Sequence, residues 1–274
     1  MRFQASNYQP ARNFSQDFMP RPKFEEQWRQ RFIQRGTVCQ DDADIAGWTR
    51  SGLEARLRNF QRLWPGDAPG ALWLDVGCGA GSYTRYLAGQ GVSPIGMDYS
   101  LPSVQKARER SPAAMTWAVG DVTQLAIRPA SLDGVLCFGV MQALSRPEQA
   151  VRELVHATRP GGQVWIDALN RDCLTTRVRC LVARLTGRAP GLRYDRVGDL
   201  AVWLEREGAT EVQVHWIPIL PGRLQRYQSL LERPWMRRLI RAVPGLGSLL
   251  SHAILVSAKR SPHPRPFSPE GRRG

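Results

Sequence analysis

Three glycines on alternate positions follow an apolar run that contains an acidic residue near its end. Residues 74–84 read LDVGCGAGSYT, with Asp75 followed by Gly77, Gly79 and Gly81. Glycine lets a backbone turn tightly and approach a ligand without a clash from Cβ. A helix that begins after such a turn points free N–H groups at whatever lies in it. The stretch therefore predicts a ligand-binding turn between a strand and a helix.

The spacing of the glycines narrows the choice of ligand class. The dinucleotide fingerprint G-x-G-x-x-G would need its third glycine at position 82, which is Ser82 in this chain. A phosphate-binding Walker loop needs a lysine that the stretch lacks. An acidic residue before the turn repels a pyrophosphate but suits a ligand that carries an ammonium group.

Two more acidic residues end the next two apolar segments. Asp98, in GMDYS, is placed to accept hydrogen bonds from two ribose hydroxyls. Asp121, in VGDV, stands beside Val122, and such a pair can bind the amino group and the ring of an adenine. One ligand with an amino acid part, a ribose and an adenine would span all three strand ends. The alternative for both acids is a helix cap or a turn.

Short apolar segments alternate with amphipathic segments from residue 71 onward, which predicts the elements that position these acids. Strands are expected at 71–76, 92–98, 114–121, 132–139, 163–169, 210–219 and 252–260. Helices are expected at 81–91, 101–110, 147–162 and 196–208. This alternation implies right-handed crossovers and an α/β fold with a doubly wound, mostly parallel seven-stranded sheet, which binds ligands at the carboxyl ends of its strands.

Five segments in order resemble the class I S-adenosylmethionine-dependent methyltransferases. They are DVGCGAGSYT, GMDYS, VGDVTQL, LDGVLCFGVMQAL and residues 159–167. The resemblance covers about residues 71–169, and strands six and seven continue it to about residue 260. It is greatest to the branch that acts on small molecules, quinones, lipids and sugars. It implies a Rossmann-like methyltransferase fold and S-adenosylmethionine as the cofactor.

The resemblance also implies cofactor-binding roles for the matching positions. The turn around the cofactor would consist of Gly77, Cys78, Gly79 and Gly81, and Asp75 would help to hold the methionine amino group.

On the nucleotide side, Asp98 would hold the ribose and Tyr99 would pack near the adenine. Asp121 and Val122 would flank the adenine. Two residues after strand four, Phe138 and Gly139, would lie along the methionine arm near the methyl group.

The catalytic residues are not evident from the sequence. Gln142 stands where relatives often carry histidine, which argues against a histidine base there. His156 is expected at the surface, and His215 and His252 lie in predicted strands near the far edge of the sheet. We assign no catalytic residue and expect no metal site.

The residues after strand five have two alternative roles. Asp167, Asn170 and Arg171 either face the acceptor pocket or cap a loop.

The chain divides into four parts by composition. Residues 1–22 are expected to form a flexible N-terminus and residues 261–274 a disordered tail. Residues 23–70 show helical spacing and are expected to form a cap over the acceptor site, from which Trp48 and Arg50 would reach the cofactor. The methyltransferase domain would occupy residues 71–260, with basic insertions at about 171–193 and 221–250.

Positive charge is concentrated late in the chain. The net charge is +14, and residues 168–260 hold 16 basic and 7 acidic residues. The arginines of 171–193 and 221–241 alternate with Leu, Val, Ile and Trp at near-helical spacing, as in helices that lie on an anionic membrane. A solvated face over the core and nucleic-acid binding remain open as alternatives.

Several protein classes are disfavoured by what the sequence lacks. No apolar run reaches the roughly 20 residues of a membrane-spanning helix, and the start has no signal-peptide core, so we expect a cytoplasmic protein with peripheral membrane contact. The 5 scattered cysteines argue against a disulfide framework. After strand four the chain reads CFGV, without the motifs of DNA methyltransferases. A small-molecule or lipid acceptor is favoured over RNA, and a catalytically inactive scaffold is a further alternative.

Overall fold

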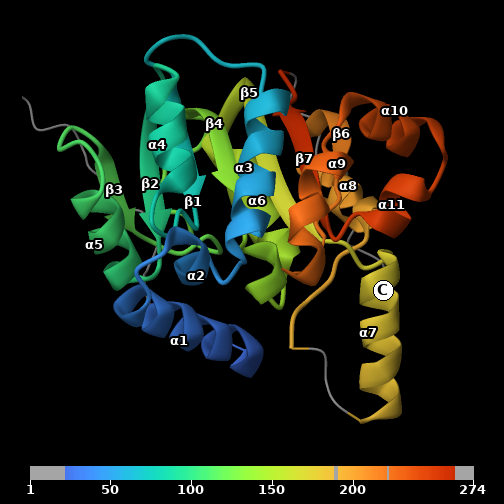
Figure 1. Cartoon of the computed structure of the whole chain (residues 1–274). Coiled ribbons are helices and arrows are strands. Elements are labelled where there is room, and N and C mark those ends of the chain that lie inside the picture. Colours follow the sequence, from blue (N-terminus) through green and yellow to red (C-terminus); the bar gives the residue numbers. More distant parts are fainter. Residues whose placement is uncertain (1–21, 188–190, 221, 263–274) are drawn as a thin grey trace, which may run out of the picture.

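A computed structural model describes residues 22–187, 191–220 and 222–262. The expectations for the flexible N-terminus and the tail fall almost wholly outside these residues. Within them the chain forms a seven-stranded sheet covered by helices on both faces (Figure 1).

The strands have the order β3-β2-β1-β4-β5-β7-β6. Their bounds are β1 Leu72–Val76, β2 Ser93–Asp98, β3 Thr116–Val119, β4 Leu132–Cys137, β5 Thr158–Leu169, β6 Ala209–Ile217 and β7 Ala253–Arg260. The pairs from β3 to β5 are parallel, whereas β7 runs antiparallel to both β5 and β6. The expected α/β class with a mostly parallel seven-stranded sheet is confirmed.

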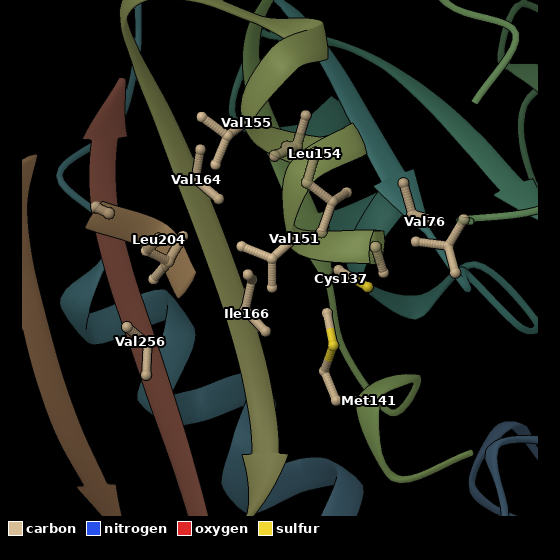
Figure 2. Close-up of a cluster of buried hydrophobic side chains, with 14 of the residues drawn as sticks. Val76, Cys137, Met141, Val151, Leu154, Val155, Val164, Ile166, Leu204 and Val256 are labelled. Carbon is tan, nitrogen blue, oxygen red and sulfur yellow. The ribbon is translucent and has the colours of Figure 1, made fainter. Parts of the chain in front are cut away.

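Two apolar layers hold the helices on the sheet. On one face, α3 (Arg50–Leu63) and α4 (Ser82–Gly89) pack Phe60 and Leu87 against Trp73 of β1. On the other face, α6 (Pro147–Ala157) and α8 (Val197–Arg206) supply a second cluster. Figure 2 shows side chains of α6 pointing toward β4 and β5 in that cluster. Burying each such side chain contributes about 1.5–3 kcal/mol.

The boundary between α6 and β5 corrects the sequence prediction. The pattern predicts a helix to residue 162, but α6 ends at Ala157 and β5 begins at Thr158. Thr158 pairs with Leu132 of β4, and the register then shifts so that Gln163 pairs with Gly134. Extended pairing therefore starts before the Pro-Gly-Gly sequence, because tertiary pairing outweighs the local helical pattern.

The cap region folds as three helices, of which α1 (Lys23–Val38) and α2 (Asp42–Ala46) precede α3. Helix α1 contacts α2, α5 (Leu101–Glu109) and the short helix η1 (Met141–Ala143). It thereby crosses from the end of β2 to the end of β4, whereas α3 packs into the core. Helices α1 and α2 thus lie over the carboxyl edge of the sheet, and α3 reaches the pocket there with Leu53.

The two basic stretches fold as helices beside the sheet. The first contains α7 (Leu174–Leu185), which projects from the body of the molecule (Figure 1). The second contains η2 (Gly222–Tyr227), α9 (Gln228–Leu231), α10 (Pro234–Ala242) and α11 (Leu246–Leu250). Among the described residues, no helix has the length and apolar character needed to cross a membrane.

Candidate active site

The turn after β1 has the conformation that the glycines predict. Gly77, Gly79 and Gly81 have φ values of +75°, +53° and +84°, a region that favours glycine. A Cβ at Gly77 would overlap Val140, and one at Gly81 would approach the Trp117 ring to 2.5 Å. The turn therefore needs glycine for both its backbone angles and its close neighbours.

Asp98 ties this turn to the end of β2. Its Oδ2 accepts a hydrogen bond from the Gly79 N–H at 3.0 Å, and its Oδ1 accepts one from the Ser100 N–H at 2.8 Å. Burial raises the pKa of the carboxyl, while the hydrogen bonds from Ser100 and Gly79 act in the opposite direction. Asp98 thus holds the glycine turn in place and lines the same pocket.

The residues expected around an adenine also line this pocket. Asp121 Oδ1 accepts hydrogen bonds from the N–H and the hydroxyl of Thr123, at 2.9 and 2.8 Å. Val122 is buried beside it, and the Tyr99 ring meets the Phe32 ring edge-on at 6.5 Å. An apolar wall and a carboxylate therefore occur together at this end of the pocket, as an adenine would require.

Asp75 occupies a different place from the other predicted residues. It is not among the residues that line the pocket, and its Oδ2 accepts a hydrogen bond from the Thr84 hydroxyl at 2.6 Å. Burial raises its pKa to about 7, against the opposing effect of the Thr84 hydrogen bond. The structure thus places Asp75 behind the turn, and its role toward an ammonium group stays a prediction.

At the end of β4, the pocket is formed by Phe138 and Gly139. Gly139 has a φ of +78°, and a Cβ there would lie 2.8 Å from the Trp48 ring. Trp48 lines the pocket from the cap, whereas Arg50 is 76% exposed and pairs with Asp41. Of the two cap residues predicted to reach the cofactor, only Trp48 is at the pocket.

Behind this wall lies an ion pair that the sequence analysis did not find. Arg56 Nε donates to Asp167 Oδ2 at 3.1 Å, and both side chains are about 95% buried or more. The Gly139 N–H donates to Asp167 Oδ1 at 2.6 Å, and the Arg56 guanidinium lies 4.3 Å from the centre of the Trp48 ring. The two charged residues are 111 positions apart, so no local pattern could have revealed the pair.

The remaining candidates after strand five and in η1 have structural partners. The Asn170 amide donates to the carbonyls of Ser248 and Ser251, and Arg171 is exposed. Gln142 is buried and donates to the Gly139 carbonyl at 2.9 Å. Asn170 therefore joins two loops, and Gln142 supports the loop after β4.

The three histidines that the structure describes lie outside the pocket of the glycine turn. His156 is exposed beside Glu207, as predicted. His215 shares a hydrogen bond with Ser257 at 3.0 Å, and burial lowers the pKa of His252 to about 4. None of them lines the pocket that contains the glycine turn.

The glycine turn, the ends of β2, β3 and β4 and the cap residue Trp48 form one continuous pocket under α1 and α2. It encloses about 1040 Å³, its open mouth included, and reaches from Asp121 past Asp98 and Gly77 to Gly139. Cys78 lies in its wall, where burial raises the pKa of the thiol well above its ordinary value. A nucleoside joined to an amino acid chain fits the lining of this pocket, which combines carboxylates, a glycine turn and apolar side chains.

Comparison with known proteins identifies a domain in the middle of the chain. Residues 74–166 match the methyltransferase domain family described as "Methyltransferase domain". Residues 74–166 are thus a methyltransferase domain, and the chain as a whole resembles the class I S-adenosylmethionine-dependent methyltransferases. S-adenosylmethionine is accordingly the cofactor of this methyltransferase, and the expected Rossmann-like fold is confirmed.

Relatives of this methyltransferase differ in the acceptor that their names give. The ubiquinone biosynthesis O-methyltransferase of Xanthomonas campestris is 28% identical, over 62% of this chain and 70% of its own. The biotin biosynthesis bifunctional protein BioHC of Cellvibrio japonicus is 33% identical, over 37% and 20%. A probable tRNA methyltransferase 9B of Mus musculus is 35% identical, over 40% and 24%. The chain thus spans less than a quarter of two of these relatives.

Solved structures share the fold. The phosphoethanolamine N-methyltransferase 2 of Haemonchus contortus in complex with S-adenosyl-L-methionine superposes with a TM-score of 0.59 at 20% identity, covering 84% of this chain and 60% of that one. Such a likeness shows the architecture and leaves the acceptor open.

Proposed function

We propose that this methyltransferase transfers the methyl group to a small, largely apolar acceptor such as a quinone, a lipid or a related metabolite. The observation that carries this proposal is the enclosure of the pocket. Helix α1 lies over the pocket with Trp28 and Phe32. Trp48, before α3, and Leu53 of α3 also line the pocket. A narrow pocket with aromatic walls accepts a small apolar molecule more readily than a folded macromolecule.

The residues of the chain would serve the reaction by binding and alignment. The glycine turn, Asp98, Tyr99, Asp121 and Val122 would hold the cofactor, which supplies an activated methyl group. Phe138, Gly139 and Trp48 would exclude water at the far end, where the acceptor enters. Alignment of two bound molecules in a dry site accounts for much of the rate of such displacements.

The test is a two-stage measurement. Isothermal titration with S-adenosylmethionine and S-adenosylhomocysteine is expected to show one site. Incubation with S-adenosyl[methyl-³H]methionine and an organic-solvent extract of the source cells is then expected to label small molecules. A protein that binds neither nucleoside would contradict the proposed function.

RNA is the alternative acceptor, because one group of relatives carries the name of a tRNA methyltransferase. The same incubation with total RNA distinguishes the two acceptors. Label in RNA, and none in the organic extract, would favour the alternative.

We also propose peripheral contact with an anionic membrane through α7 and α10. Five apolar side chains of α7 are at least 52% exposed and recur at helical spacing: Leu174, Val178, Leu181, Val182 and Leu185. Residues 174–185 include three arginines and no acid. On α10, Trp235 is 54% exposed. Exposed apolar stripes flanked by arginines suit an anionic lipid surface, where apolar acceptors reside.

Co-sedimentation with vesicles of phosphatidylglycerol and phosphatidylcholine tests this contact. The parent protein is expected to bind, and to bind less at high salt, because salt screens charge. Leu181→Glu is expected to reduce binding. The matched control is Val202→Glu, since Val202 on α8 is 52% exposed and outside this face. Equal binding of all three proteins would contradict the proposed contact.

A further inference from the structure

Tyr83 belongs to the first turn of α4, directly after the glycine turn. It lines the pocket and is 5% exposed. Its ring meets the Phe138 ring edge-on at 4.9 Å and the Phe60 ring at 6.0 Å. These contacts fix the ring, and the position of the hydroxyl is fixed with it.

The Tyr83 hydroxyl is buried and has no hydrogen-bond partner among the described residues. Leaving a buried polar group unsatisfied costs about 1–3 kcal/mol. A phenylalanine would fill the same aromatic cluster without that cost. The hydroxyl therefore needs a partner, and the Tyr83 side chain is one of those that line the pocket, where a ligand would supply one.

The strand order indicates whether Tyr83 lies on the nucleotide side of the pocket or on the opposite side. Asp98 ends β2, which lies on one side of β1, and Asp121 follows β3 on the same side. Phe138, which contacts Tyr83, follows β4 on the opposite side of β1, next to β5. The hydroxyl thus lies on the side away from the nucleotide.

The buried charged groups behind this wall are already engaged. Both oxygens of Asp167 accept hydrogen bonds, one from Arg56 and one from the Gly139 N–H. Trp48 covers Arg56 from the pocket side. Tyr83 is therefore the pocket-lining side chain of this wall whose polar atom has no partner among the described residues.

We propose that the Tyr83 hydroxyl is the hydrogen-bonding contact for the polar group of the methyl acceptor, an oxygen or nitrogen group such as a phenol, an alcohol or an amine. This assignment rests on the proposed function. Burial, followed by the charge of Asp167, raises the pKa of Tyr83 well above its ordinary value. The hydroxyl stays protonated, so Tyr83 orients the acceptor by donating a hydrogen bond and takes no proton from it.

The test compares two probes that differ in one hydroxyl group. Protein saturated with S-adenosylhomocysteine is titrated with 4-fluorophenol and with fluorobenzene, and binding is followed by ¹⁹F NMR. The parent protein is expected to prefer the phenol by roughly fivefold, the usual effect of one net hydrogen bond. Tyr83→Phe is expected to abolish the preference and to leave the affinity for S-adenosylhomocysteine within about twofold.

Tyr86→Phe is the matched control, because it removes a hydroxyl from the same helix but outside the pocket. This variant is expected to keep the preference. The inference is overturned if Tyr83→Phe keeps it, if the parent shows none, or if Tyr83→Phe weakens S-adenosylhomocysteine binding more than about tenfold. A parent protein that does not bind S-adenosylhomocysteine would instead contradict the proposed function.

Discussion

Asp98 would perform two tasks with one carboxylate. Its oxygens hold the N–H groups of Gly79 and Ser100, and it would also bind the ribose. Asp98→Asn keeps the shape but loses the charge and one acceptor. Hydrogen bonds to charged groups contribute about 1.5–3 kcal/mol, so the affinity for S-adenosylhomocysteine is expected to fall about 10- to 100-fold. Isothermal titration measures this, and an affinity within a factor of two would exclude the ribose role.

Asp75 leads to a pH-dependent prediction. Its pKa is about 7 in the folded protein against 3.8 as the ordinary value, so the folded state binds the extra proton between these pH values. Stability without cofactor therefore falls as the pH rises from about 4 to 7, by up to roughly 4 kcal/mol. Asp75→Asn is expected to remove this loss and to be more stable than the parent at pH 8. Urea unfolding at pH 5 and pH 8 measures the difference, and an equal effect at both pH values would contradict it.

The same variant tests the predicted contact between Asp75 and the methionine amino group. If the carboxylate holds that ammonium, Asp75→Asn binds S-adenosylmethionine more weakly although it is the more stable protein. Unchanged affinity would restrict Asp75 to its hydrogen bond with Thr84.

At the level of residues, the sequence reveals those parts of the site that follow one another closely along the chain. Gly77 and Asp98 end predicted strands, so strand order alone brings them to one edge. Arg56 and Tyr83 carry no such pattern, because their importance comes from the side chains packed on them. A buried ion pair and an unsatisfied hydroxyl are properties of tertiary packing that a single sequence does not display.

Helix α1 lies over the pocket, and its single glycine, Gly36, allows close contact with the start of α5. A Cβ at Gly36 would lie 2.5 Å from the Ser103 hydroxyl and 2.8 Å from that of Ser100. Gly36→Val is expected to lift α1 and to speed the dissociation of S-adenosylhomocysteine about tenfold or more, since a raised α1 no longer covers the ligand. Stopped-flow fluorescence of Trp28 is a suitable probe.

Gly89→Val is the matched control for this element. Gly89 also lies in a helix, but a Cβ there meets no atom within 4 Å. Both variants carry the same change in helix propensity, a small gain, because valine is a better helix former than glycine. Equal dissociation rates would show that α1 does not govern access to the pocket.

Elements with strong local signals are predicted well, and those set by pairing are not. Helix α5 begins at Leu101, as the sequence predicts, whereas the start of β5 depends on pairing with β4. The antiparallel direction of β7 likewise depends on its neighbours and not on its own composition.

For the whole molecule, cofactor binding is expected to raise the midpoint of thermal unfolding. A ligand at 100 times its dissociation constant stabilises a protein by about 2.7 kcal/mol, which corresponds to roughly 5–10 °C at this size. Differential scanning fluorimetry with S-adenosylhomocysteine measures the shift, and adenosine at equal concentration is expected to give a smaller one. A larger shift with adenosine would contradict the binding of the methionine part.

The position of β7 has a consequence for synthesis. This strand is near the end of the described chain, yet it lies between β5 and β6 and is the only described strand that pairs with β6. Until residues 253–260 leave the ribosome, β5 keeps an open edge and β6 has no partner strand. The nucleotide half of the sheet, complete by residue 169, can form while the rest is still being translated, so the cofactor pocket can start to assemble before the protein is finished.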